Sequence, residues 1–119
     1  MEDSNSEELP KIYDVRLMFY LDKRVVNVQI RYLKKGHSTA EKVEEIVPYP
    51  EEIRDSDLSW TRFEGEKIAV YHRKDKYKYV DLNHNLTLPT AGLSHSLERL
   101  VYQVHNRRLL LIKQKHQTK

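Results

Sequence analysis

A run in the second half of the chain mixes basic and aromatic side chains in a way that suits nucleic-acid binding. It reads Tyr71-His72-Arg73-Lys74-Asp75-Lys76-Tyr77-Lys78-Tyr79. Lysine and arginine neutralise backbone phosphates, and an aromatic ring beside them stacks on an unpaired base. This chemistry requires Tyr71 or Tyr79 to point outward beside Arg73 or Lys78. The alternative is an ordinary pair of strands, with the lysines outside and the tyrosines in the core.

Other basic residues extend the expected footprint, both after the first pair of strands (Lys34 and Lys35) and near the carboxyl terminus. No aromatic RNP pattern, helix-turn-helix signature or zinc finger accompanies them, so the hypothesis depends on side-chain chemistry alone. The predicted nucleic-acid-binding residues are Tyr71, Arg73, Lys74, Lys76, Lys78, Tyr79, Arg107, Arg108, Lys113 and Lys115.

The histidines and carboxylates of the sequence predict no catalytic or metal site. Six histidines are present, but no His-Glu-x-x-His pattern occurs, and a helix would place His95 and His105 on different sides. The acid pairs Glu44-Glu45 and Glu51-Glu52 fall in what looks like a solvated helix face and a loop, without the fixed separation that acid–base catalysis needs. The chain has no cysteine, no Gly-x-Ser-x-Gly and no glycine-rich phosphate loop. We therefore predict a non-enzymatic protein without metal, cofactor or small-molecule substrate.

Charge is distributed in alternating blocks. The net charge is only +3, yet residues 1–9 and 41–57 are acidic, whereas residues 11–35, 62–78 and 107–119 are basic. Such blocks either form separate basic and acidic surfaces or neutralise each other in the fold, and the sequence leaves both alternatives open. A second hypothesis is therefore a protein-interaction or homodimeric accessory protein without nucleic-acid contact. The apolar run Leu109–Ile112 supports it, because this run needs a partner unless it is internal.

Composition also bears on location. The absence of cysteine fits a reducing cytosol. The acidic, polar residues 1–8 do not resemble a secretory signal, and no apolar stretch approaches the ~20 residues of a membrane span. We therefore expect a cytoplasmic protein with no membrane contact.

Two alternating runs, Tyr13–Leu21 and Val26–Tyr32, predict an antiparallel hairpin joined by Asp22-Lys23-Arg24. Alternate residues of each run are apolar, so each strand buries one face and exposes the other. Tyr13, Val15, Leu17, Phe19 and Leu21 share the buried side of the first run, opposite Asp14, Arg16, Met18 and Tyr20. In the second run the exposed side carries Asn27, Gln29 and Arg31.

The rest of the sequence predicts further short elements. We expect a short helix over residues 39–47 ended by Pro48, then strands over residues 60–64, 67–73 and 76–82. Leu93, Leu97, Leu100, Val101 and Val104 fit an amphipathic helix capped by Ser94 or Ser96. After His105 two alternatives are open: the helix continues, since Leu111 and Ile112 stay near its apolar stripe, or a break at residues 106–108 precedes a last strand over residues 109–113. We favour the break, because four consecutive apolar residues suit a buried strand.

These elements occur in the order β-β-α-β-β-β-α with a possible last β. This order predicts an α+β fold, with a mostly antiparallel sheet packed on one longer C-terminal helix. The domain is expected to span residues 11–113, between a disordered acidic tail (1–10) and a basic tail (114–119).

Overall fold

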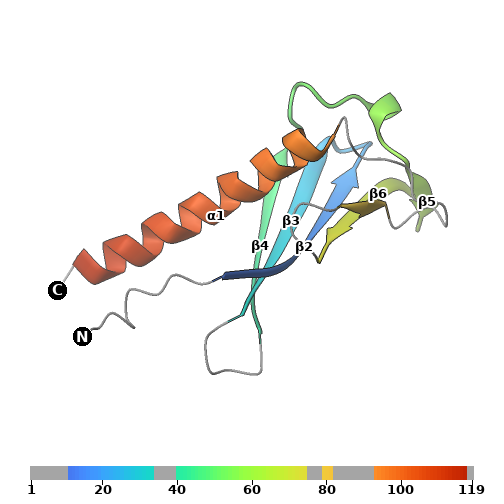
Figure 1. The fold of residues 1–119 in the computed structure, drawn as a ribbon. Coiled ribbons are helices and arrows are strands. Elements are labelled where there is room, and N and C mark those ends of the chain that lie inside the picture. Colours follow the sequence, from blue (N-terminus) through green and yellow to red (C-terminus); the bar gives the residue numbers. More distant parts are fainter. Residues whose placement is uncertain (1–10, 34–39, 75–78, 82–92, 118–119) are drawn as a thin grey trace.

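A computed structural model describes residues 11–33, 40–74, 79–81 and 93–117. The expected tail over residues 1–10 lies outside this part of the chain. Six antiparallel strands form one sheet, in which the path runs β4-β3-β2-β6-β5 and β7 pairs with β6. Helix α1 (Ser94–Gln117) lies across one face of the sheet (Figure 1). The predicted α+β class, with a mostly antiparallel sheet and one longer C-terminal helix, is confirmed. The strands are β2 (Lys11–Tyr20), β3 (Val25–Leu33), β4 (Ala40–Pro48), β5 (Thr61–Phe63), β6 (Glu66–Arg73) and β7 (Val80–Asp81), and a single turn of 3-10 helix, η1, covers Asp55–Asp57.

The predicted hairpin is present as β2 and β3, with Leu17 opposite Val28. Its alternate apolar residues are buried, as expected, with one exception at the start of β2. There the pairing shifts register between Ile12 and Asp14, so the intervening Tyr13 is the extra residue of a bulge. Tyr13 is therefore 39% exposed, and Ile12 packs against the core instead.

Residues 40–48 form strand β4, so the short helix predicted over residues 39–47 is wrong. Val43 lies opposite Ile30 and Val47 opposite Val26. The two valines are four residues apart, a spacing that fits both the helical period of 3.6 and the strand period of two. The segment forms a strand because its backbone pairs with the N–H and C=O groups along the edge of β3, which a helix could not do.

Helix α1 continues to Gln117, so the predicted break at residues 106–108 and the strand over residues 109–113 are wrong. The arginines placed at the expected break tie the helix to β4: Arg107 Nη2 lies 2.5 Å from Glu45 Oε2, and Arg108 donates to Glu41. Beyond them Leu110 and Leu111 are 58% and 60% exposed. Residues 114–117, expected to belong to a basic tail, are helical.

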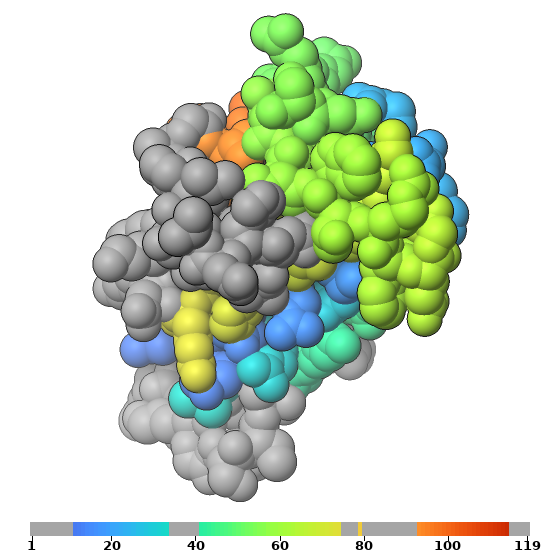
Figure 2. Space-filling model, turned by 90° about the vertical axis from the view of Figure 1, so that its right-hand side faces the viewer, coloured from blue at the N-terminus to red at the C-terminus, as the bar shows by residue number. Residues whose placement is uncertain are grey.

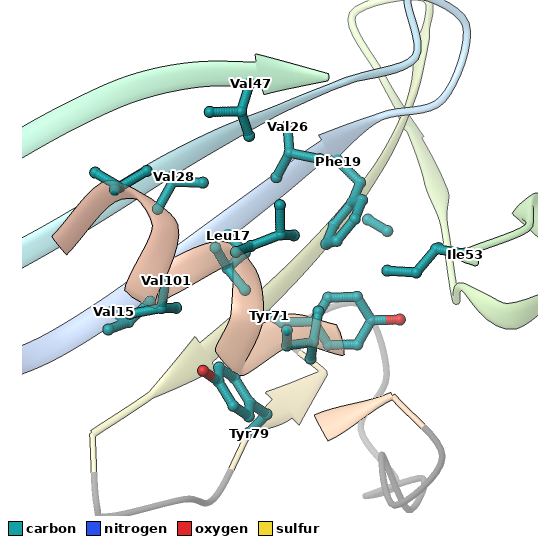
Figure 3. Close-up of a cluster of buried hydrophobic side chains, with 14 of the residues drawn as sticks. Val15, Leu17, Phe19, Val26, Val28, Val47, Ile53, Tyr71, Tyr79 and Val101 are labelled. Atoms are coloured by element: carbon teal, nitrogen blue, oxygen red, sulfur yellow. The ribbon is translucent and has the colours of Figure 1, made fainter. Parts of the chain in front are cut away.

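The core lies between α1 and the facing side of the sheet. Figure 3 shows Val15 and Leu17 of β2 and Val28 of β3 beside Val101 of α1. All four side chains are fully buried. Burying one such side chain stabilises the fold by about 1.5–3 kcal/mol, so this layer is the main source of stability.

A polar contact between Tyr32 of β3 and His105 of α1 lies at the margin of this core. The Tyr32 hydroxyl lies 2.8 Å from His105 Nδ1, and the two rings stack with centroids 5.5 Å apart. Burial raises the pKa of Tyr32 to about 12 and lowers the pKa of His105, because both charged forms lose their hydration. The pair is therefore neutral and joins α1 to β3.

The structure describes part of the three strands predicted between residues 60 and 82. β5 and β6 correspond to the strands expected over residues 60–64 and 67–73, and Glu64 and Gly65 form the turn with positive φ angles of 53° and 83°. β7 falls within the strand expected over residues 76–82, of which residues 76–78 and 82 lie outside the described part.

Candidate functional site

Three of the predicted nucleic-acid-binding residues lie in the core rather than on the surface. Tyr71, Arg73 and Tyr79 are only 2%, 7% and 6% exposed. Because β6 pairs with β2, Tyr71 lies opposite Leu17, and both point towards α1. Figure 3 shows Tyr71 and Tyr79 among the buried apolar side chains. Neither ring can stack on a base in this arrangement, so the structure corrects the expectation that one of them points outward.

Arg73 and Tyr79 instead converge on one carboxylate of the helix. Arg73 Nη1 donates to both oxygens of Glu98 at 2.8 Å, and the Tyr79 hydroxyl donates to Glu98 Oε1. Burial is the main cause that raises the pKa of Tyr79, and the hydrogen bond to Glu98 adds to it. We call Arg73, Tyr79 and Glu98 the buried clamp, because it fastens β6 and the β7 region to α1.

The remaining predicted residues are dispersed. Arg107 and Arg108 pair with Glu45 and Glu41 of β4, whereas Lys74 and Lys113 are exposed, just after β6 and on α1 respectively. The side chain of Lys115 is not described, and Lys34, Lys35, Lys76 and Lys78 lie outside the described residues. The predicted residues that are described therefore form no common basic patch.

A basic–aromatic cluster does occur at β5, where sequence analysis did not place one. Trp60 is 40% exposed, with Lys67 Nζ 4.8 Å and the Arg62 guanidinium 6.0 Å from its ring. The pairing of Arg62 with Lys67 across the β5–β6 hairpin brings the two cations to the same ring. The short turn at Gly65 could have predicted this cluster from the sequence, because it fixes the register that places Arg62 opposite Lys67.

The sheet face opposite α1 is the second surface on which polar and charged side chains gather, and we call it the outer face. Its residues alternate with those of the core, and Figure 2 shows side chains of β6, β2, β3 and β4 next to one another on this side of the molecule. The strand register places Arg16 between Gln29 and His72, and Arg31 between Asp14 and Lys42. These six residues line a depression of about 220 Å³, the cationic depression.

Asp14 organises one side of the cationic depression. It is 5% exposed, and Arg31 donates to it through Nε at 2.9 Å and through Nη2. His72 Nε2 lies 3.5 Å from Asp14 Oδ2. The hydrogen bond from Arg31 is the main cause that lowers the pKa of Asp14, against the opposing effect of burial. Asp14 is therefore ionised at neutral pH and fixes the Arg31 side chain.

Carboxylates of the fold do little to neutralise Arg16 and Lys42. Arg16 is exposed and has no side-chain hydrogen bond or ion pair within the described ranges. Lys42 Nζ lies 3.8 Å from Glu44 Oε1, with both side chains about half exposed. Ion pairs of this kind at the surface are weak, because water and salt screen them. The depression thus presents cations that the fold does not neutralise.

The outer face is apolar beside this depression. The register puts Met18 next to Val70 on one side and Asn27 on the other, and Ile46 follows across Asn27. Ile46 is 58% exposed, and Met18, Tyr20 and Val70 are half-buried. We call Met18, Tyr20, Ile46 and Val70 the apolar strip.

Part of the outer face is predicted by the sequence. Alternation assigned Asp14, Arg16, Met18 and Tyr20 to the exposed side of β2, and Asn27, Gln29 and Arg31 to that of β3. It missed His72 and Lys42, because their place beside Arg16 and Arg31 follows from strand pairing that the sequence does not reveal.

No group of three or more histidine or carboxylate side chains in the described ranges has the geometry of a metal site. Within the same ranges, no helix combines the length and the apolar character needed to cross a membrane. Comparison with protein families, with curated proteins and with solved structures found no match. The functional proposal therefore starts from the surface alone.

Proposed function

We propose that the chain is a small, non-enzymatic binding protein whose outer face binds a partner protein. The observation that carries this proposal is the apolar strip lying directly beside the cationic depression on one sheet face. Protein interfaces combine an apolar centre with a polar rim, and exposed apolar residues gathered on one surface commonly mark such a site. The cations of the depression would favour a partner with acidic residues at its rim.

The distribution of ion pairs supports a protein partner over a nucleic acid. Binding to a phosphate backbone requires several cations that are free to replace counterions. In this fold many of the arginines are paired with carboxylates from other parts of the chain. These pairs are Arg24–Asp55, Arg73–Glu98, Arg99–Glu52, Arg107–Glu45 and Arg108–Glu41.

The contacts of two titratable residues, His105 and Asp14, support a binding role rather than catalysis. His105 is half-buried and stacked on Tyr32, and Asp14 is held by Arg31. General acid–base catalysis needs a titratable group that reaches a substrate, whereas these groups serve the fold. The cytoplasmic location expected from the composition is part of the same proposal.

A displayed library of random peptides tests the proposal, because selection on the full chain does not require the partner to be identified first. The selected peptides should be rich in apolar and acidic residues. Ile46→Lys should weaken their binding by about tenfold or more, because it places a charge in the apolar strip. Leu110→Lys is the matched control, since Leu110 is equally exposed (58%) but lies on α1. Equal loss with both variants, or loss with Leu110→Lys alone, would refute the outer face as the binding surface.

Nucleic-acid binding is the second candidate, and the Trp60 cluster is the observation that favours it. Trp60 with Arg62 and Lys67 offers one stacking ring and two cations that have no carboxylate partner in the described ranges. A labelled single-stranded oligonucleotide should then shift at low ionic strength, and Trp60→Ala should abolish the shift. If no shift occurs, or if Trp60→Ala leaves it unchanged, this candidate fails.

A further inference from the structure

The cationic depression has properties that the proposed protein interface does not require. Its residues come from four strands, namely β2, β3, β4 and β6, so the sheet itself holds their backbones in place. Residues directly opposite each other on neighbouring strands have Cβ atoms about 4.5–5.5 Å apart. Arg16 therefore lies close to Gln29 and His72, at the centre of the depression.

The charge of the lining is positive. Arg16, Arg31 and Lys42 face one carboxylate, Asp14, which gives these four side chains a formal charge of +2. Asp14 directs both of its oxygens to Arg31, with His72 beside them, and so cancels only one of the cations. The neighbouring Glu44 does not line the depression.

Glu44 uses Oε2 to accept hydrogen bonds from Asn27 Nδ2 at 2.8 Å and from Gln29 Nε2 at 3.4 Å. This leaves Arg16 as the donor best placed for a ligand. A guanidinium presents paired N–H groups that match two oxygens of one anion. His72 directs Nε2 to Asp14 Oδ2, so it helps to fix Asp14 and leaves Arg16 and Lys42 as the donors for a ligand.

We propose that the cationic depression binds a phosphate monoester or an equivalent doubly charged tetrahedral oxyanion, with Arg16 as the main donor and Lys42 of β4, next to Arg31, as the second cation. Two negative charges match the formal charge of +2 on the lining, in which Arg16 has no carboxylate partner among the described residues and Lys42 has only a weak surface pair with Glu44. A volume of about 220 Å³ holds such a group together with part of the molecule that carries it. A phosphodiester carries a single charge on each phosphate and fits this balance less well. The site does not depend on the apolar strip, and therefore not on the proposed protein partner.

Titration of the isotope-labelled full chain with inorganic phosphate at constant ionic strength tests the site. Amide signals of Arg16, Gln29, Arg31 and His72 should shift and saturate, and sulfate should produce the same pattern. Chloride and acetate at equal ionic strength should not. Arg16→Gln should weaken phosphate binding by about tenfold, the loss expected for one charge-assisted hydrogen bond. Lys113→Gln removes a cation from α1 and should leave binding unchanged.

Three further ligands distinguish the sources of the phosphate. A peptide with one phosphoserine should bind more tightly than its unphosphorylated form if the natural ligand is a modified side chain. A sugar phosphate should bind more tightly than inorganic phosphate if the ligand is a small molecule. A dinucleotide joined by an internal phosphodiester should bind weakly, and binding as tight as that of phosphate would contradict the preference for a dianion.

Two outcomes overturn the site itself. One is a set of linear, non-saturating shifts spread over all basic residues, which indicates charge screening rather than a bound ion. The other is unchanged phosphate binding in Arg16→Gln, with a spectrum that shows the variant is folded. Because Ile46→Lys should leave phosphate binding intact, failure of the phosphate site and failure of the protein interface are distinguishable.

Discussion

Replacing Glu98 by glutamine should destabilise the protein strongly, because Arg73 would remain buried without a counter-charge. The Arg73 side chain is 8% exposed and that of Glu98 is 20% exposed. Removing one partner of a buried ion pair costs about 3–5 kcal/mol, whereas its formation from the unfolded chain gains little. For a domain of this size the melting temperature should fall by more than about 10 °C.

Urea denaturation followed by circular dichroism measures this change, with the free energy of unfolding taken from the midpoint and slope. Glu52→Gln is the matched control, because Glu52 makes the same kind of pair with Arg99 at 2.9 Å on the surface. Water replaces a lost partner there, so the control should unfold close to wild type. The triple variant Arg73→Met, Tyr79→Phe and Glu98→Leu should recover most of the lost stability, since it removes both charges together with the hydroxyl that donates to Glu98.

The clamp is refuted as a buried ion pair if Glu98→Gln and Glu52→Gln cost the same free energy. It is also refuted if the triple variant is less stable than Glu98→Gln alone, because the loss would then come from packing and not from an unpaired charge. A changed slope in urea would instead mean that the variant alters the compactness of one state.

Other substitutions test the remaining layers of the structure. Val28→Asp should prevent cooperative unfolding as seen by calorimetry, because it places a charge in the core where Val28 is fully buried; a soluble, cooperatively melting variant would contradict the assignment of that face. Asp14→Asn should make the free energy of unfolding less dependent on pH in the acidic range. The pKa of Asp14 is lower when folded than its ordinary 3.8, so its stabilisation is present above that value and is lost as pH falls through the folded value. Urea melts between pH 5 and pH 2, about the range where carboxylates titrate, measure this pH dependence of stability. A pH dependence identical to that of the wild type would refute the prediction. Leu111→Gln should leave the melting temperature within a few degrees of wild type, about the range for exposed positions, since Leu111 is 60% exposed; a large loss would mean that the far end of α1 is covered.

The sequence predicted those parts of the fold that depend on neighbouring residues. The β2–β3 hairpin has strict alternation and a short turn, and both features act locally. Helix α1 was predicted over its buried half because Leu97, Leu100, Val101 and Val104 recur at helical spacing. Neither prediction depends on the residues that lie across the core.

The errors occurred where a distant partner decides the structure. Val43 and Val47 fit a strand as well as a helix, and the free edge of β3 selects the strand. The run Leu109–Ile112 resembles a buried strand, yet Arg107 and Arg108 anchor the helix to β4 just before it. Neither influence is visible within a window of neighbouring residues.

The candidate site illustrates the same limit. The residue types of Tyr71 and Arg73 suit a polyanion and so predict a surface position, but strand pairing with β2 directs both towards the core. The outer face was recognised as polar and basic, because alternation alone separates it from the core. Its depression could not be recognised, since Lys42 and His72 join Arg16 only through the order of four strands.

The charge blocks of the sequence largely neutralise each other, which limits the ligands that the surface can bind. The acidic block of residues 41–57 meets basic residues that are distant in the sequence, as Glu41 with Arg108, Glu45 with Arg107 and Asp55 with Arg24 show. Within the described residues, these pairs neutralise cations that would otherwise extend a basic surface. In the same part of the chain, Arg16 in the depression and Arg62 and Lys67 around Trp60 have no carboxylate partner, and Lys42 has only a weak surface pair with Glu44. The exposed Lys74 follows β6, and the exposed Lys113 lies on α1. Ligands with one compact anionic group suit this arrangement better than an extended polyanion does.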